Sequence, residues 1–319
     1  MPEAGSADPR IAGERPRDAT WIHRLALTVL AGTFLLILAG GNVTSKDAGL
    51  AVPDWPLSFG SVNPAGWTRQ PYVRDEHGHR LIGAAVGLLV TALLVGVLIR
   101  DSRGPAKALA AALWLGIALQ GLMGGLRVTE KSVHLAMVHG VFAQVVFCMV
   151  TAVATITSPR WRRIGAGVEP VWTASPSQDR ALRLLPLLMT ACLFVQLVLG
   201  VILRHRGSSW IPHAAWAMVV MLALLAGSYA IMSHPRARHE LSYGAVALLL
   251  LGGVQLLLGL VTLMIVVHMT SPVPATTAQA VVPTLHLGVG AVLLAMSVHV
   301  AMVAWRLTSA PAGPAESRT

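Results

Sequence analysis

The chain has 319 residues, of which 55% are hydrophobic and 12% are charged, and its mean hydropathy is +0.66. A water-soluble domain of this size could not bury so large an apolar excess, so the composition indicates an integral membrane protein. The net charge of +10 comes from basic residues at the ends of the apolar runs. This distribution favours membrane lipid as a partner and argues against nucleic acid.

Eight apolar runs are long enough to cross a bilayer, which requires roughly 20 mostly apolar residues. Short polar stretches, or stretches with Pro and Gly, separate them. The runs lie at residues 25–43, 81–99, 108–128, 134–157, 184–203, 211–232, 243–267 and 282–305. The sequence therefore predicts an all-α membrane protein with eight transmembrane helices.

The spans form two groups of four. We divide the chain into a polar tail (1–20), an N-terminal half (21–158), a linker (159–182), a C-terminal half (183–307) and a second polar tail (308–319). Because each half has an even number of spans, both halves enter the membrane in the same orientation. This arrangement predicts two tandem four-helix bundles related by a pseudo-two-fold axis along the membrane normal.

The distribution of Lys and Arg predicts the orientation, because short cytoplasmic loops carry an excess of both. Eight of the 24 lie on the side opposite the N-terminus, and these are Lys46, Arg69, Arg74, Arg80, Arg127, Lys131, Arg204 and Arg206. We therefore expect a multi-pass protein of the bacterial plasma membrane with the tails and the linker in the cytoplasm.

The first outer loop, from Thr44 to Asp75, is long for this chain. Within it, Pro53 and Pro56 flank an Asp-Trp pair and stiffen the segment. The loop could serve as a lid over a site in the first half. The alternative is that Trp55 is an interfacial aromatic anchor.

A histidine stands near the outer end of every inward-running span, followed four residues later by a small residue. The pairs are His79 with Gly83, His139 with Ala143, His213 with Ala217 and His286 with Gly290. An ionisable side chain within a span is costly and marks a functional candidate. The small residue lies on the same helix face one turn deeper, which leaves room for a flat macrocycle.

A second repeat runs through three outward spans, where a glutamine precedes a glycine by four residues. These pairs are Gln120 with Gly124, Gln196 with Gly200 and Gln255 with Gly259. The first span has glycines at the comparable height but no glutamine.

Two imidazoles on opposing helices are the axial pair that haem iron accepts. We therefore predict a haem in each half, with His79 and His139 as iron ligands in the first and His213 and His286 in the second. Zinc is the competing metal, but it would need further ligands near each pair. Only the first half offers one, at Glu76.

The two halves differ in the residue three positions before the first histidine of each pair. This residue is Glu76 before His79 and Trp210 before His213. A carboxylate beside a haem edge can accept or relay protons, which makes Glu76 the catalytic candidate. The alternative is that Glu76 is a first-turn residue favoured by the helix dipole.

Other polar residues near the outer ends leave alternatives open. Arg80, Arg127 and Arg204 could bind haem propionates through their guanidinium groups. They could equally extend to the lipid headgroups. His134, five residues before His139, is a second candidate for that ligand position.

Three segments of the chain resemble the haem A synthase family, and the histidine spacing matches that family as well. The segments are residues 41–45 (GNVTS), 49–56 (GLAVPDWP) and 76–80 (EHGHR). The resemblance extends over nearly all of the hydrophobic chain. One departure is that some members carry a cysteine pair in the first outer loop, where this chain has none.

The resemblance implies oxidation of the C8 methyl group of haem O to a formyl group, which gives haem A for terminal oxidases. The first half would bind haem O as substrate and haem A as product, with Glu76 required for turnover. The second half would hold a resident haem b. The implied partners are a haem O synthase, oxidase assembly factors and an electron donor that the sequence does not identify.

Two other classes of function stay open at this point. A di-haem b membrane cytochrome that passes electrons from quinol would need the same histidines. A transporter built from tandem repeats would show interrupted spans or charged residues near mid-bilayer, and the sequence shows neither clearly. The oligomeric state is also open, a homo-oligomer included.

Overall fold

The structure is a computed structural model that describes residues 20–166, 174–267 and 276–309. Helices make up nearly all of these residues. Their bounds are α1 (Thr20–Ser45), η2 (Trp67–Arg69), α2 (Pro71–Arg100), α3 (Gly104–Thr129), α4 (Val133–Thr157), α5 (Pro159–Gly165), α6 (Pro176–Arg206), α7 (Ile211–Ser233), α8 (Pro235–Val267) and α9 (Thr277–Ser309). Apart from one residue in the first tail and two in the second, the predicted tails lie outside the described residues.

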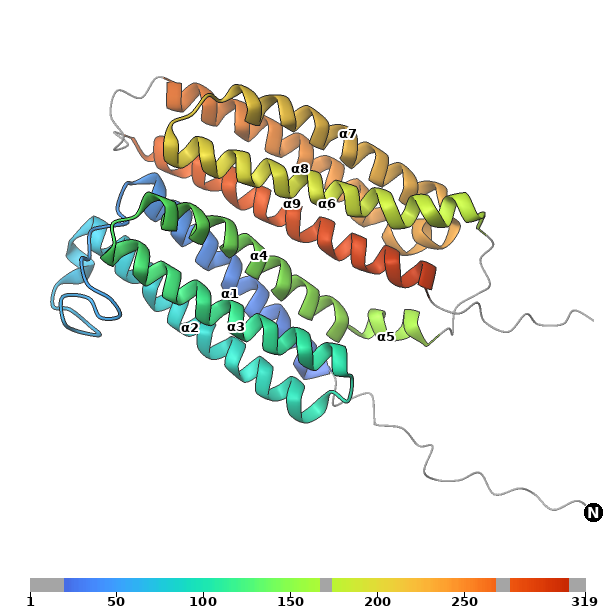
Figure 1. Cartoon of the computed structure of the whole chain (residues 1–319), viewed down its shortest axis with the longest axis horizontal. Helices are drawn as coiled ribbons and strands as arrows, with labels where there is room; N and C mark the ends of the chain where they lie inside the picture. The colour runs from blue at the N-terminus through green and yellow to red at the C-terminus, as the bar shows by residue number, and fades with distance from the viewer. Residues whose placement is uncertain (1–19, 167–173, 268–275, 310–319) are drawn as a thin grey trace, which may run out of the picture.

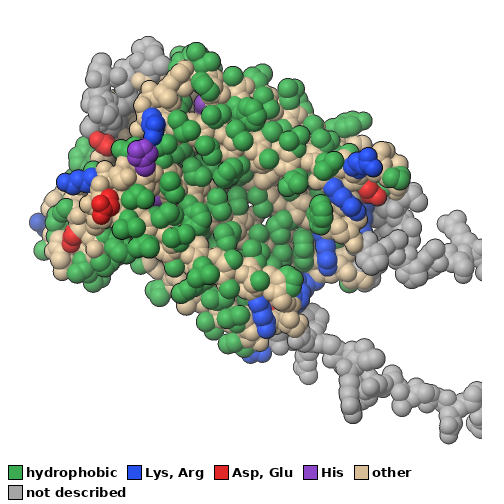
Figure 2. Space-filling model, viewed as in Figure 1, with side chains coloured by type: hydrophobic (Ala, Val, Ile, Leu, Met, Phe, Trp, Pro, Cys, Tyr) green, Lys and Arg blue, Asp and Glu red, His purple; other side chains and the backbone are tan. Residues whose placement is uncertain are grey.

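Eight of the described helices are long and apolar enough to cross a membrane, namely all except η2 and α5. They run side by side along the long axis of the molecule (Figure 1). Hydrophobic side chains cover the middle of the face in Figure 2, and charged side chains lie towards the two ends. The prediction of an all-α membrane protein with eight spans is confirmed.

Several helices extend beyond the apolar runs that predicted them. α2 begins at Pro71 rather than near 81, and α6 begins at Pro176 rather than near 184. Proline suits a first helical turn because its missing N–H would have no partner there. Hydropathy marks only the part of a helix inside the hydrocarbon core, so it misses these polar turns. For the same reason the predicted linker 159–182 contains α5 and the start of α6.

The buried side chains gather in two large clusters and one small one. One large cluster draws chiefly on α1 to α4, and the other on α6 to α9. The small cluster joins them through Ile37 of α1, Phe147 of α4, and Ala291 and Ala295 of α9. α9 therefore lies at the boundary between the two groups of helices, as Figure 1 shows.

Candidate functional site

Each of the four histidines packs against a glycine of the preceding transmembrane helix. The Cε1 atom of each ring lies 3.0 Å from where a Cβ on that glycine would stand. The pairs are His79 on Gly40, His139 on Gly124, His213 on Gly200 and His286 on Gly259. A methyl group at any of these glycines would displace the imidazole, so the bare backbone determines where the rings lie.

In the second half the two rings face each other. The ring centroids of His213 and His286 are 6.3 Å apart, and their planes are inclined by 75°. Both side chains are partly buried. The Nδ1 atom of His286 is buried without a hydrogen-bond partner in the structure. A buried polar atom left unpaired is costly, which points to a missing partner for this ring.

The first half resembles the second in its unpaired ring nitrogens. His79 and His139 each have a buried Nδ1 atom without a hydrogen-bond partner. The two side chains lie close enough to interact electrostatically. The Arg127 guanidinium is within electrostatic range of both rings. This half therefore combines a histidine pair with a cationic side chain.

The glutamines of the second repeat hold three of the histidines. Gln120 Nε2 donates to the His139 carbonyl over 3.0 Å, and Gln196 Nε2 donates to the His213 carbonyl over 3.0 Å. Gln255 Nε2 lies 3.4 Å from His286 Nε2. The sequence showed the repeat of glutamine and glycine but not its role, which is to seat the histidine of the next transmembrane helix.

The residues of both pairs suit a haem held between two imidazoles. With metal–nitrogen bonds of roughly 2 Å, two rings that bind iron from opposite sides have centres about 6 Å apart. The spacing of His213 and His286 agrees with this value. A zinc site is poorly supported, because no three His, Cys, Asp or Glu side chains converge within the described parts of the chain.

Glu76 is buried, with 3% of its surface exposed, near the start of α2. Its Oε1 atom lies 2.6 Å from Arg80 Nη2, and its Oε2 atom accepts the Val52 N–H over 2.9 Å. Arg80 also donates to the carbonyl oxygens of Val52, Asp54 and Leu57. The Glu76–Arg80 pair therefore fastens the loop between α1 and α2.

This loop, residues 46–70, has further attachments. Arg127 donates to the Gly49 carbonyl over 2.8 Å, and Ser58 Oγ lies 2.8 Å from His77 Nδ1. The Trp55 ring occupies the space where a Cβ on Gly125 would stand, next to the glycine that seats His139. The loop thus lies beside the first histidine pair, as a lid would.

Asp54 gives the loop its internal turn. Its carboxylate accepts the N–H groups of Phe59 over 2.7 Å and of Gly60 over 2.8 Å. The N–H groups of Gly60 and Phe59 hold the pKa of Asp54 below its usual range. Asp54 therefore stays ionised at neutral pH and keeps both donors satisfied.

The three arginines at the outer ends have different partners. The guanidinium of Arg80 is occupied by Glu76 and the loop, as described above. Arg127 and Arg204 each make one side-chain hydrogen bond in the described part of the chain, Arg204 to Ser45 Oγ over 3.1 Å. Arg127 and Arg204 are therefore the better candidates for an anionic group.

The structure does not support two expectations from the sequence, namely His134 as a possible ligand and Gly290 as open space for a macrocycle. His134 is exposed, and its Nε2 lies 2.6 Å from Arg206 Nη2, which places it on the protein surface. Gly290 does not leave open space for a macrocycle, because a Cβ there would stand 3.0 Å from Gln255 Nε2. The glycines that shape the sites lie instead on the preceding transmembrane helices.

The connection between the first two transmembrane helices differs in length between the two halves. Twenty-five residues (46–70) join α1 to α2, whereas four residues (207–210) join α6 to α7. Trp210, which matches Glu76 in sequence, is 46% exposed and caps α7 without a side-chain hydrogen bond. Of these two connections, only the first forms a fastened loop beside a histidine pair.

The fold and the paired histidines define a polytopic membrane protein with two similar polar centres, of which the first lies beside the α1–α2 loop. Residues 23–211 match the model of a family described as cytochrome oxidase assembly protein (COX15-CtaA). The chain belongs to this family, and the resemblance seen in the sequence is confirmed.

Two of three individual relatives carry the name haem A synthase, and the third carries the name of another haem-modifying enzyme. A haem A synthase of Symbiobacterium thermophilum is 32% identical over 59% of this chain and 60% of its own length. A haem A synthase of Caulobacter sp. K31 is 31% identical over 50% and 47% of the two chains. A protohaem IX farnesyltransferase of Haloarcula marismortui is 36% identical over 41% of this chain and 28% of its own length. The chain thus spans less than two thirds of each of these relatives.

Proposed function

We propose that this protein is a haem A synthase, which oxidises the C8 methyl group of haem O to a formyl group. The observation that carries the proposal is the inequality of two otherwise similar centres. Both have a histidine pair seated on glycines, but among the described residues only the first has a buried carboxylate and an attached loop beside it. One substrate site and one resident site explain this difference.

The residues of the first centre would divide the work of binding the substrate. His79 and His139 would hold haem O, and the free donors of Arg127 would pair with a propionate. Arg204, which reaches Ser45 across the two halves, is the second propionate candidate. The loop around Trp55 would limit the access of water to the site.

Glu76 would transfer protons in addition to holding the α1–α2 loop in place. Conversion of the methyl to the formyl group replaces two carbon-bound hydrogens by one oxygen, so the site needs a group that can exchange protons. The Glu76 carboxylate is buried beside this pair and could accept a proton if Arg80 moved with the loop. The bound haem would supply the redox chemistry through its iron.

The second centre would hold haem b between His213 and His286, where it serves structure or electron transfer. Similarity to haem A synthases supports the synthase over the electron-passing cytochrome considered above. We further propose a bacterial plasma-membrane location with cytoplasmic termini. The implied partners remain a haem O synthase, oxidase assembly factors and an unidentified electron donor.

The test is a reaction in membranes that lack any other haem A synthase. The full chain is expressed there, haem O is supplied, and the extracted pigments are identified by mass. Haem A beside haem B is the expected result. Haem B alone, at a normal level of folded protein, would instead indicate the di-haem cytochrome.

A further inference from the structure

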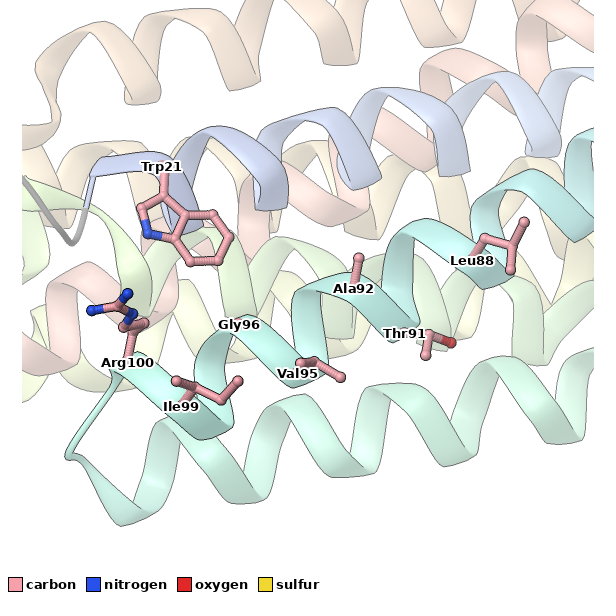
Figure 3. Close-up of a pocket in the computed structure, with 8 residues that line it drawn as sticks. All are labelled: Trp21, Leu88, Thr91, Ala92, Val95, Gly96, Ile99 and Arg100. Atoms are coloured by element: carbon pink, nitrogen blue, oxygen red, sulfur yellow. The ribbon is translucent and has the colours of Figure 1, made fainter.

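An apolar groove runs along the outside of α2 at the end of the molecule where α1 begins (Figure 3). Its walls include Trp21 of α1 and Leu88, Ala92, Val95 and Ile99 of α2, and its cavity volume is about 520 Å³. From Leu88 to Ile99 the helix rises roughly 16 Å. The groove is therefore long enough for much of an extended hydrocarbon chain.

Trp21 closes the groove against a glycine. A Cβ on Gly96 would stand 2.6 Å from the Trp21 Cη2 atom, so the bare backbone lets the indole lie on α2. The Trp21 side chain is still 42% exposed. Tryptophan commonly lies at the headgroup level of a bilayer, which places this end of the groove at the membrane surface.

The groove ends at a cationic side chain. Arg100 is exposed, and its guanidinium makes no hydrogen bond or ion pair within the described parts of the chain. Arg100 also borders a second, smaller cavity, of about 80 Å³, together with Asp101, Arg103 and Arg162. One residue therefore connects an apolar groove to a polar pocket.

The polar pocket carries excess positive charge. Asp101 forms ion pairs with Arg103 over 2.6 Å and with Arg162 over 3.5 Å. One carboxylate thus serves two guanidinium groups, and Arg100 adds a third without a partner. The Nε atom of Arg162 is also buried without a hydrogen-bond partner. An anion in this pocket would satisfy these donors.

We propose that the groove and the pocket together bind one anionic phospholipid. An acyl chain would lie between Leu88 and Ile99, and the phosphate would bind Arg100 and Arg162. A free phosphate would leave the groove unexplained. A zwitterionic lipid would bring a phosphate but also a quaternary ammonium, which adds positive charge to a pocket that already has an excess of it. The charge and the shape therefore point to the same amphiphilic ligand.

The test measures lipid retention by native mass spectrometry of the purified full-length protein. Phosphatidylglycerol and phosphatidylcholine with identical acyl chains are compared. We expect phosphatidylglycerol to be retained preferentially. Arg100→Gln should weaken its binding roughly fivefold, which corresponds to about 1 kcal/mol. Ala92→Phe, which fills the groove from an exposed position, should weaken the binding of both lipids.

Matched variants serve as controls. Arg238→Gln removes an exposed arginine of α8, and Ala215→Phe enlarges an exposed alanine of α7. Neither should change retention. Equal binding of the two lipids, or equal effects of Arg100→Gln and Arg238→Gln, would overturn the proposal. It would also fail if inorganic phosphate displaced the lipid while Ala92→Phe had no effect. Should Ala92→Phe not fold, Thr91→Leu fills the same groove.

Discussion

Glu76 has a structural role in the α1–α2 loop and a proposed role in proton transfer, and a single substitution can separate the two. Its carboxylate fastens the α1–α2 loop through Val52 and Arg80, and it is buried on the helix that carries His79. We predict that Glu76→Gln keeps the side-chain volume and an acceptor for Val52 but cannot take up a proton. Formation of haem A should fall about a hundredfold, in line with the loss of a general base. The measurement is haem A yield per folded protein.

Glu76→Ala should be more severe, because it leaves the Arg80 guanidinium, 16% exposed, without its carboxylate. Removing one partner of a buried pair typically costs about 3 kcal/mol or more. Second-half haem should nevertheless remain bound. Glu130→Gln, an exposed change at the end of α3, is the control. Normal haem A yield from Glu76→Gln would rule out a required proton role.

His213 belongs to the proposed resident site. We predict that His213→Ala removes most of the haem b while haem O still binds in the first half. The physical reason is that each iron loses an axial ligand only from its own pair. Pigment extraction after separate loading with haem O measures both sites.

His134→Ala is the matched control for this experiment, since His134 is exposed and contacts Arg206. It should leave both pigments in place. Loss of first-half pigment from His134→Ala, with His139→Ala retaining it, would reverse the assignment of that ligand.

At the scale of helix pairs, the contact between glycine and histidine can be tested by replacing the glycine with alanine. We predict that this change lowers pigment binding but does not lower the stability of the fold. Gly124→Ala adds a methyl group 3.0 Å from His139 Cε1, so the ring must shift. Alanine should also stabilise α3 by about 1 kcal/mol relative to glycine. We expect lower pigment content in the first half without a lower thermal midpoint.

The control lies one turn away. A Cβ on Gly121 would meet nothing within 4 Å, so Gly121→Ala should keep its pigment. Gly259→Ala and Gly253→Ala give the same comparison on α8 for the second half. Equal pigment content in the members of each pair would show that the glycines do not position the rings.

The loop between α1 and α2 should respond to pH through Asp54. The pKa of Asp54 is lower in the folded protein than in the unfolded chain, where it is about 4. The ionised Asp54 carboxylate therefore stabilises the folded loop at every pH above that unfolded pKa. The effect is lost as the pH falls through the lower folded pKa. Hydrogen exchange at Phe59 and Gly60 should therefore respond to Asp54 only in strong acid. Asp54→Asn should speed exchange there at neutral pH, and Asp47→Asn, an exposed change in the same loop, should not.

For the whole molecule, the sequence predicted the class of fold and the number of spans, because bilayer thickness imposes a length that hydropathy can measure. It could not predict that α2 begins at Pro71, since its first turns are polar. It also placed His213 and His286 on facing helices, where the structure has their rings 6.3 Å apart.

The contacts that shape the sites were harder to predict. The pairing of Gly124 with His139 joins neighbouring helices, and spacing along one helix carries no information about it. The sequence also offered Arg80 as a propionate ligand. In the structure the α1–α2 loop folds back onto α2, and its carbonyl groups accept the hydrogen bonds of the Arg80 guanidinium. Tertiary contacts of this kind depend on how helices and loops meet, which a periodic pattern does not specify.

The short helix α5 is held against the second group of helices at the end opposite the loop. Glu240 of α8, whose side chain is 3% exposed, pairs with Arg160 of α5 over 2.8 Å and with Arg163 over 3.1 Å. We predict that Glu240→Ala lowers stability by about 1–2 kcal/mol, because charged hydrogen bonds are lost while water partly hydrates the freed arginines. A lower thermal midpoint with unchanged haem A yield per folded protein is expected. Arg238→Ala, two residues earlier and exposed, should leave the midpoint unchanged. A Glu240→Ala midpoint equal to that of Arg238→Ala would mean that this ion-pair cluster does not stabilise the packing of α5 against α8.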